Sequence, residues 1–289
     1  MKLFFGGVRG GYPVSDPAFR SVGMDTTSIL IVGETDEAII IDAGSGLRGV
    51  FEQLVTWLPE LRTVLLCCSH FHLDHVAGLP AFKAWYDAAW TVEAASRIIG
   101  ELTIEDVVTS MIQPPWWPLT LDQLPATKRF RILDDESLQA PSVYGGLTLR
   151  WCPLEHPGGS TAFRIDEPAS GQAIVFASDL EWALADETRR DQLRALCAQP
   201  QPATLLIVDG QYDEETYEAH RGWGHSTWQE GIALAQATGV PEVKLTHHAP
   251  HLTDADAAAH EQRIQTAWPA ATLARQGDIW TAGRPVTTT

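Results

Sequence analysis

Short apolar runs that end in an acidic residue or a histidine recur along this chain, and they constrain its fold more than any other feature. Four such runs are TVLLCCSH at 63–70, AIVFASD at 173–179, ATLLIVDG at 203–210 and EVKLTHH at 242–248. Their leucine and β-branched content is typical of strands buried inside a sheet. Helical patterns alternate with such runs, for example residues 47–58, which precede the first of the four and end before Pro59. The alternation predicts a single layered α/β domain over residues 1–289.

Two further segments have clear local signals. The apolar runs 28–33 and 37–44 are separated by Gly33-Glu34-Thr35-Asp36, which predicts a hairpin. Residues 226–239 predict a helix with Ser226 or Thr227 as N-cap, Glu230 near the capping-box position and Gly239 as C-cap.

Composition limits the environment and the partners. The formal net charge of −17 opposes binding to long polyanions such as RNA and to anionic membrane surfaces. No apolar run is long enough for a membrane span, and the apolar patch in MKLFFGGVRGGYP is too short for a signal peptide. The cysteines show no CxxC spacing, so we expect reduced core residues in a cytoplasmic protein: Cys67, Cys68, Cys152 and Cys197.

The stretch SHFHLDHVAG at 69–78 is the strongest chemical signal. It holds three of the ten histidines of the chain, and it follows a predicted buried strand. Residues i and i+2 of an extended strand point to the same side, so His70 and His72 point together. Asp74 and His75 lie at the turn into the next helix and can face the same space. Imidazole and carboxylate groups together suit a zinc site.

The rest of the chain supplies further ligand candidates, each just after a predicted strand. Ligands tend to gather at the carboxyl edge of such a sheet, so we expect these residues to meet the cluster. They are His156, Asp179, His247 and His248.

These motifs resemble those of the metallo-β-lactamase-fold hydrolases. The resemblance rests on HFHLDHVAG at 70–78, EHPGG at 155–159, SD at 178–179 and KLTHHAP at 244–250. GHST at 224–227 makes it closer to the branch of ribonuclease Z and the cyclic-nucleotide and cyclic-phosphate phosphodiesterases. GGVRGGYP at 6–13 and IIIDAG at 39–44 fit the opening loop and hairpin of that branch. The resemblance implies a four-layer αβ/βα sandwich.

The resemblance also implies a dinuclear metal site. His70, His72 and His156 would hold the first divalent ion, and a second triad would hold the other: Asp74, His75 and His247. Asp179 would bridge both ions. His247 is preferred because it follows Leu-Thr, as in the family pattern, and His248 is the alternative. Zn²⁺ suits this ligand set, and Mn²⁺ or Fe are alternatives.

Two residues are expected to take part in the chemistry itself. A hydroxide bridging the metals would attack a phosphodiester in line. His225 resembles the histidine beside the scissile phosphate and is suited to protonate the leaving group or to steady the phosphoryl oxygens. Asp74 is expected to orient the nucleophile as well as to bind metal.

Four other residues are candidates for the surroundings of the site. We expect Asp42 and Asp209 each to orient a ligand histidine. Trp116 and Trp117 lie in the apolar loop QPPWWPLTLDQLP, and we interpret them as a pocket wall because such a loop is too apolar to lie bare in water. Residues 100–140, which match the family least, are expected to line the substrate entrance.

The sequence therefore predicts a metal-dependent hydrolase, most simply a phosphodiesterase on a small substrate such as a cyclic nucleotide or cyclic phosphate. A lactonase or another C–O or C–N hydrolase of the same fold is the alternative. A tRNA 3′ processing endonuclease is disfavoured because no flexible basic arm is visible after His156 and the charge is unsuitable. A non-catalytic binding protein is disfavoured because all seven ligands are present. The branch also implies a homodimer.

Overall fold

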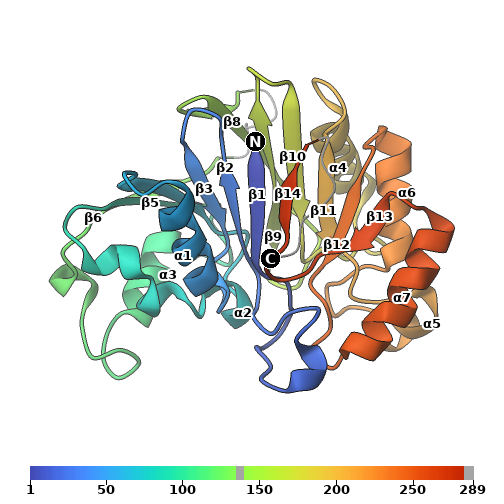
Figure 1. Cartoon of the computed structure of the whole chain (residues 1–289), viewed down its shortest axis with the longest axis horizontal. Coiled ribbons are helices and arrows are strands. Elements are labelled where there is room, and N and C mark those ends of the chain that lie inside the picture. The colour runs from blue at the N-terminus through green and yellow to red at the C-terminus, as the bar shows by residue number, and fades with distance from the viewer. Residues whose placement is uncertain (135–139, 283–289) are drawn as a thin grey trace.

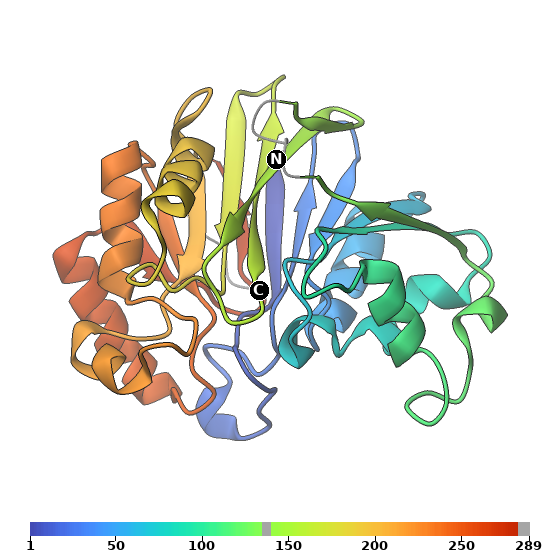
Figure 2. The same ribbon diagram turned by 180° about the vertical axis from the view of Figure 1, so that it is seen from behind.

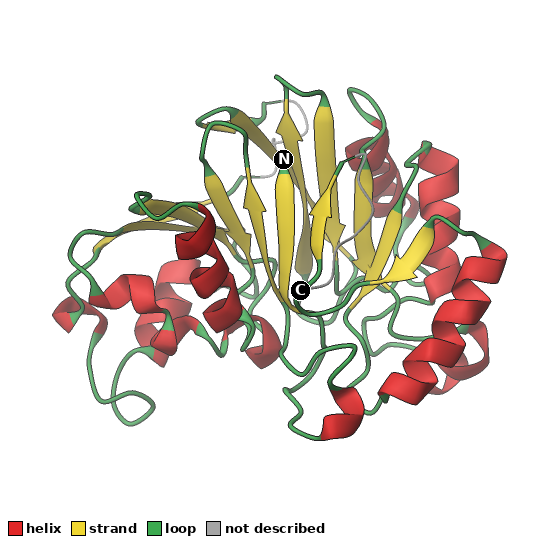
Figure 3. Ribbon diagram, viewed as in Figure 1, coloured by secondary structure: helices red, strands yellow, loops and turns green. Residues whose placement is uncertain are grey.

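The computed structural model describes residues 1–134 and 140–282 and contains two mixed sheets packed face to face. Figures 1 and 3 show the strands at the centre of the molecule and the helices on its two outer sides. This arrangement is the predicted αβ/βα sandwich. Within the described residues, no helix has the length and the apolar character needed to cross a membrane.

The first sheet has the order β14-β1-β2-β3-β4-β5-β6. Strands β3 to β6 run parallel, while β14, β1 and β2 add antiparallel pairs. The strands span β1 Lys2–Gly7, β2 Ser28–Val32, β3 Ala38–Ile41, β4 Thr63–Cys67, β5 Thr91–Ser96, β6 Thr127–Ile132 and β14 Ile279–Thr281.

The second sheet has the order β13-β12-β11-β10-β9-β8-β7. Strands β10 to β13 run parallel, and β7 to β10 form an antiparallel meander. The strands span β7 Ser142–Tyr144, β8 Leu147–Leu154, β9 Ser160–Glu167, β10 Gln172–Ala177, β11 Leu205–Asp209, β12 Val243–Thr246 and β13 Ala271–Leu273.

The helices cover the outer faces of the two sheets. Helices α1 and α3 pack on the first sheet, and α4, α6 and α7 pack on the second, as Figures 1 and 2 show from opposite sides. The α-helices span α1 Leu47–Trp57, α2 Leu73–Val76, α3 Ile104–Met111, α4 Glu187–Ala198, α5 Glu214–Tyr217, α6 Trp228–Thr238 and α7 Asp254–Ala267. The 3₁₀ turns span η1 Pro17–Phe19, η2 Leu79–Ala81, η3 Lys83–Tyr86, η4 Leu121–Gln123 and η5 Glu218–His220.

Burial on both faces of the central strands explains their continuous apolar runs. In β2, Ile29 and Ile31 face the core between the sheets, whereas Leu30 and Val32 face the core beneath α1. This is the period-2 alternation of a strand with no solvent face. The four cysteines are all buried and free, as the sequence predicted.

Candidate metal centre

The predicted ligands meet at the edge where strands of both sheets end. Asp42 follows β3, His70 lies in the loop after β4, Asp179 follows β10, and His247 follows β12. Short helix α2, at the lower edge of the sandwich in Figure 1, carries Asp74 and His75. The gathering of strand ends predicted from the sequence is therefore present in the structure.

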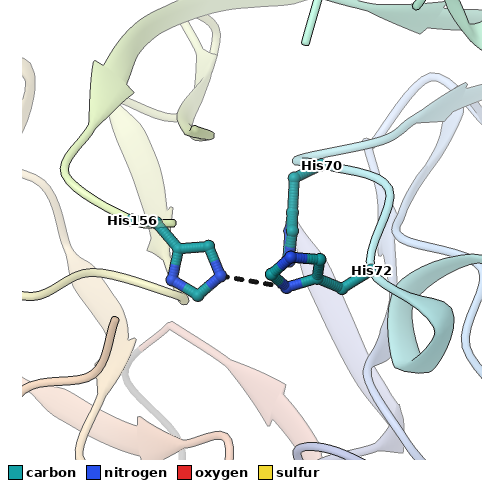
Figure 4. Close-up of side chains that lie close together, drawn as sticks. All are labelled: His70, His72 and His156. Carbon is teal, nitrogen blue, oxygen red and sulfur yellow. Dashed lines mark hydrogen bonds between the residues drawn. The ribbon is translucent and has the colours of Figure 1, made fainter. Parts of the chain in front are cut away.

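Three histidines form the first group (Figure 4). The ligating atoms of His70, His72 and His156 all lie within 4.8 Å of one another. His72 Nδ1 and His156 Nε2 are 3.1 Å apart. His70 is buried, and its Nε2 has no hydrogen-bond partner within the described structure. A buried nitrogen left in this state is costly unless an ion accepts its lone pair.

Asp74, His75 and His247 form the second group. His75 Nε2 is 3.3 Å from His247 Nε2 and 3.4 Å from Asp74 Oδ2. His247 Nε2 is 3.2 Å from the same carboxylate oxygen. All three side chains are buried. One carboxylate and two imidazoles that converge in this way suit a divalent cation.

Asp179 lies between the two groups. Its Oδ1 is 3.6 Å from His70 Nε2 and 3.2 Å from His247 Nε2, and its Oδ2 is 3.2 Å from His75 Nε2. Burial alone would raise the pKa of Asp179, but the surrounding imidazoles hold it well below the ordinary value. The carboxylate is therefore ionised and faces both groups, as a bridging ligand must.

Asp42 fixes the orientation of the His75 ring. Its Oδ2 accepts a hydrogen bond from His75 Nδ1 at 2.8 Å, and its two oxygens also accept bonds from the backbone N–H and the hydroxyl of Ser69. Nδ1 of His75 must therefore carry the proton, which leaves the Nε2 lone pair for a metal. Asp42 thus contacts His75, and its role in orienting a metal ligand stays a prediction.

Three of these acidic and histidine residues adopt a left-handed backbone conformation. The φ angles are 61° at Asp42, 58° at Asp179 and 61° at His247. Residues other than glycine rarely adopt this conformation, and such strain is often found at functional sites. Each of the three directly follows a strand or lies two residues beyond one, so the strained turn redirects the side chain toward the centre.

His225 adjoins both groups without belonging to either predicted triad. Its Nδ1 donates to Asp209 Oδ2 at 2.8 Å, and its ring stacks on His247 with a centroid distance of 4.6 Å. It also lies 5.4 Å from the His156 ring. Burial lowers the pKa of His225, but Asp209, together with the carboxylates of Asp179 and Asp74, raises it to about 9. Asp209 thus contacts His225, whereas the sequence predicted a contact of Asp209 with one of the ligand histidines.

Three predicted residues lie apart from the cluster. His248 is buried and its Nε2 donates to the Ala274 carbonyl at 2.8 Å, so the structure brings His247, and not His248, to the ligand groups. Burial lowers the pKa of His248 to about 4. Trp117 packs on the core beneath the first sheet, while Trp116 is 76% exposed. A role of either tryptophan as pocket wall stays a prediction.

The segment expected at the substrate entrance is only partly covered by the structure. Residues 104–111 form α3, which packs beside β5 and β6. Residues 135–139 lie outside the described residues. The role of 100–140 at the entrance stays a prediction.

The opening loop contacts the site through its backbone and through glycines that lack a side chain. The backbone N–H of Gly11 donates to Asp74 Oδ2 at 2.6 Å. A Cβ at Gly10 would lie 2.1 Å from Cε1 of His247. Gln211 accepts from His247 Nδ1 at 2.9 Å. The glycine-rich run GGVRGGYP was the only signal for the first two contacts, because backbone groups and missing side chains leave little trace in a sequence.

The donor set fits divalent metal ions. Imidazole nitrogens and carboxylate oxygens from both sheets converge within a few ångströms, and one buried nitrogen lacks a partner. Nitrogen atoms of neighbouring imidazoles also approach one another without a carbonyl or hydroxyl between them. A cation in each group would resolve both features.

Comparison with known proteins identifies the family. Residues 37–248 match the family model of the β-lactamase superfamily domain. The ribonuclease Z of Clostridium acetobutylicum is 21% identical in an alignment 282 positions long, which covers 86% of this chain and 88% of that protein.

Solved structures show the same fold. Human tRNase Z, short form, superposes with a TM-score of 0.66 at 18% identity and covers 98% of this chain and 100% of its own. The metallo-β-lactamase fold protein YhfI from Bacillus subtilis superposes with a TM-score of 0.66 at 19% identity. The superposition covers 96% of this chain and 98% of YhfI. With its sandwich, its strand-end cluster and a family model that matches residues 37–248, this chain belongs to the β-lactamase superfamily and is a metal-dependent hydrolase.

Proposed function

We propose that the chain is a dinuclear phosphodiesterase that acts on a small substrate. His70, His72 and His156 would hold one divalent ion, a second triad of Asp74, His75 and His247 would hold another, and Asp179 would contact both. Zinc is the proposed metal because most of the ligands are imidazoles, with Mn²⁺ and Fe as alternatives.

The contact between Asp209 and His225 carries the proposal of phosphodiester chemistry. The carboxylate of Asp209 accepts the Nδ1 proton of His225, which leaves Nε2 of that ring to hold a second proton. The ring adjoins His156 and His247, one from each group. His225 would donate this proton to the leaving oxygen, as general acids do.

The remaining roles belong to the metals and to Asp74. Bound divalent cations would supply an acidic water and would offset the negative charge of the phosphate. Asp74, held by the N–H of Gly11, would orient the attacking water in addition to binding metal. Hydrolysis of a lactone or another carbonyl substrate needs the same metals, so it remains the alternative.

The size of the substrate is the second part of the proposal. The net charge of −17 opposes a long polyanion, which favours a cyclic nucleotide or cyclic phosphate. The relatives named ribonuclease Z make RNA the second candidate. A direct comparison on one preparation separates the two: metal content, then hydrolysis of bis-p-nitrophenyl phosphate, a cyclic-nucleotide panel and a precursor tRNA with a 3′ extension.

Each outcome of that comparison has a distinct meaning. About two metals per chain, with chelator-sensitive cleavage of the small diesters, would support the proposal. Cleavage of precursor tRNA with little turnover of small diesters would replace it by RNA processing. Two metals without any phosphodiester cleavage would favour the lactonase alternative, and absence of metal would contradict the ligand assignment.

The role of His225 gives the first prediction. His225→Ala should lower kcat on a phosphodiester about 10²–10⁴-fold, the usual contribution of a general acid, while both metals stay bound. His251→Ala is the control, because His251 is exposed and outside both groups. Full turnover by the His225 variant, measured with a cyclic nucleotide whose leaving alkoxide needs a proton, would refute the assigned role.

A further inference from the structure

Glu181 is a buried carboxylate that contacts none of the proposed ligands directly. It lies two residues after Asp179 and is 1% exposed. Its Oε1 accepts bonds from the Tyr217 hydroxyl at 2.8 Å and from the Gly222 N–H at 2.6 Å. Its Oε2 accepts a bond from the Gly224 N–H at 2.7 Å. Three donors from one segment thus converge on one carboxylate, and bonds of this charge-assisted kind are among the stronger ones in proteins.

The two glycines that Glu181 binds lead directly into the site. The carbonyl of Gly224 accepts from His156 Nδ1 at 2.8 Å, which fixes the tautomer of this proposed ligand and turns its Nε2 toward His72. Gly224 also packs against the ring, since a Cβ there would lie 2.3 Å from His156 Nδ1. His225 is the next residue. The position of residues 222–225 therefore determines the position of both histidines.

Neighbours of Glu181 hold the far end of the same segment. The hydroxyl of Ser226 accepts from the Trp182 N–H at 3.0 Å and donates to the Leu180 carbonyl at 2.5 Å. Residues 180–182 thus bind residues 222–226 at both ends. Between these anchors, Gly222 and Trp223 are exposed, and the two glycines have φ of 88° and 93°. An exposed loop with left-handed glycines has many other conformations available, so it needs such anchors to stay in one.

We propose that Glu181 is a positioning residue that clamps residues 222–225, and that through this loop it sets the orientation of His156 and His225. The consequence for metal binding rests on the proposed ligand role of His156. The clamp itself does not depend on that role, because its hydrogen bonds are formed by the chain alone.

Glu181→Gln tests the clamp with minimal change of shape. A glutamine has one acceptor oxygen and an amide that donates, so Gly222 or Gly224 must lose its acceptor. Amide hydrogen exchange across 222–225 should accelerate at least tenfold in metal-free protein. Affinity for Zn²⁺, measured by competition with a chromogenic chelator, should fall about 10–100-fold, the usual effect of losing a partner of a ligand histidine.

Glu167→Gln is the matched control. Glu167 is 3% exposed and accepts bonds from the Glu34 N–H and the Ser170 hydroxyl, but it ends β9 at the edge away from the histidines. Its variant should leave Zn²⁺ affinity and exchange at 222–225 within twofold of the parent. A general loss of stability would affect both variants, whereas loss of the clamp would affect only the Glu181 variant.

Two outcomes would overturn the proposal. One is exchange at 222–225 in Glu181→Gln equal to that of the parent protein. The other, available even if the variant does not fold, is rapid exchange of the Gly222 amide in the parent protein, where the clamp requires protection. If the parent bound no metal, the proposed function would fail, but the exchange comparison would still test the clamp.

Discussion

At the scale of single residues, the centre depends on Gly10 as much as on its ligands. A Cβ at this position would lie 2.1–2.7 Å from three atoms of the His247 ring, and the bond from His247 Nδ1 to Gln211 holds that ring in place. Gly10→Ala should therefore displace His247 and lower affinity for the second metal about 10–100-fold, as loss of ligand support usually does. Metal stoichiometry in a chelator series measures this effect.

Gly49→Ala provides the comparison for that variant. Gly49 lies in α1, and a Cβ there would meet only the Gly6 carbonyl, at 4.0 Å. Alanine is the better helix former, so this variant should keep both metals and gain about 0.5–1 kcal/mol in free energy of unfolding. If Gly10→Ala bound two metals with the affinity of the parent protein, then either His247 is not a ligand or the loop around residue 10 moves aside without displacing His247.

At the scale of elements, the start of α6 fixes the chain directly after His225. Thr227 accepts from the Glu230 N–H, and the Glu230 carboxylate accepts from the Thr227 N–H, which completes a capping box. Thr227→Ala should lower the free energy of unfolding by about 1 kcal/mol, the usual effect of losing such a cap. Urea denaturation measures this change.

A variant in the cap of α7 serves as the control for the variant in the cap of α6. Thr253 and Asp256 form the same reciprocal bonds at the start of α7, far along the chain from His225. Thr253→Ala should lower the free energy of unfolding by an amount similar to that of Thr227→Ala. Only Thr227→Ala should also lower phosphodiester turnover. Equal turnover in the two variants would mean that α6 does not help to place His225.

At the scale of the whole molecule, the two groups of proposed ligands join the two sheets. The first sheet and α2 supply His70, His72, Asp74 and His75, while the loops and strand ends of the second sheet supply His156, Asp179 and His247. Metals bound to the folded state alone stabilise it, by about 2.7 kcal/mol when the free ion is at 100 times its dissociation constant. Chelation should therefore lower Tm in one cooperative transition.

Asp179→Asn is the control for the chelation experiment. The asparagine has nearly the shape of the aspartate but lacks its charge between the groups, so its Tm should hardly respond to the chelator. A chelator-independent Tm in the parent protein would contradict metal binding across the sheets. Two separate transitions would contradict the prediction of a single domain over 1–289, which has not otherwise been tested. The homodimer and the cytoplasmic location also stay predictions.

The sequence by itself determined the class of fold and most of the ligand candidates. Apolar runs indicate burial because a strand covered on both faces tolerates few polar residues. The residues from His70 to His75 supply imidazole and carboxylate groups, which suit a divalent metal. The hairpin of β2 and β3, the end of α1 before Pro59 and the caps Thr227 and Gly239 were confirmed because they depend on local interactions.

Only the tertiary structure decided which distant residues act together. Strands β1, β5, β7, β13 and β14, which lie at or next to an edge of a sheet, were missed because strands there depend on pairing with their neighbours more than on their own sequence pattern. The choice of His247 over its neighbour His248 depends on a left-handed turn at φ 61°. The contact between Asp209 and His225 and the clamp by Glu181 join residues 16 to 43 positions apart, and only folding brings them together.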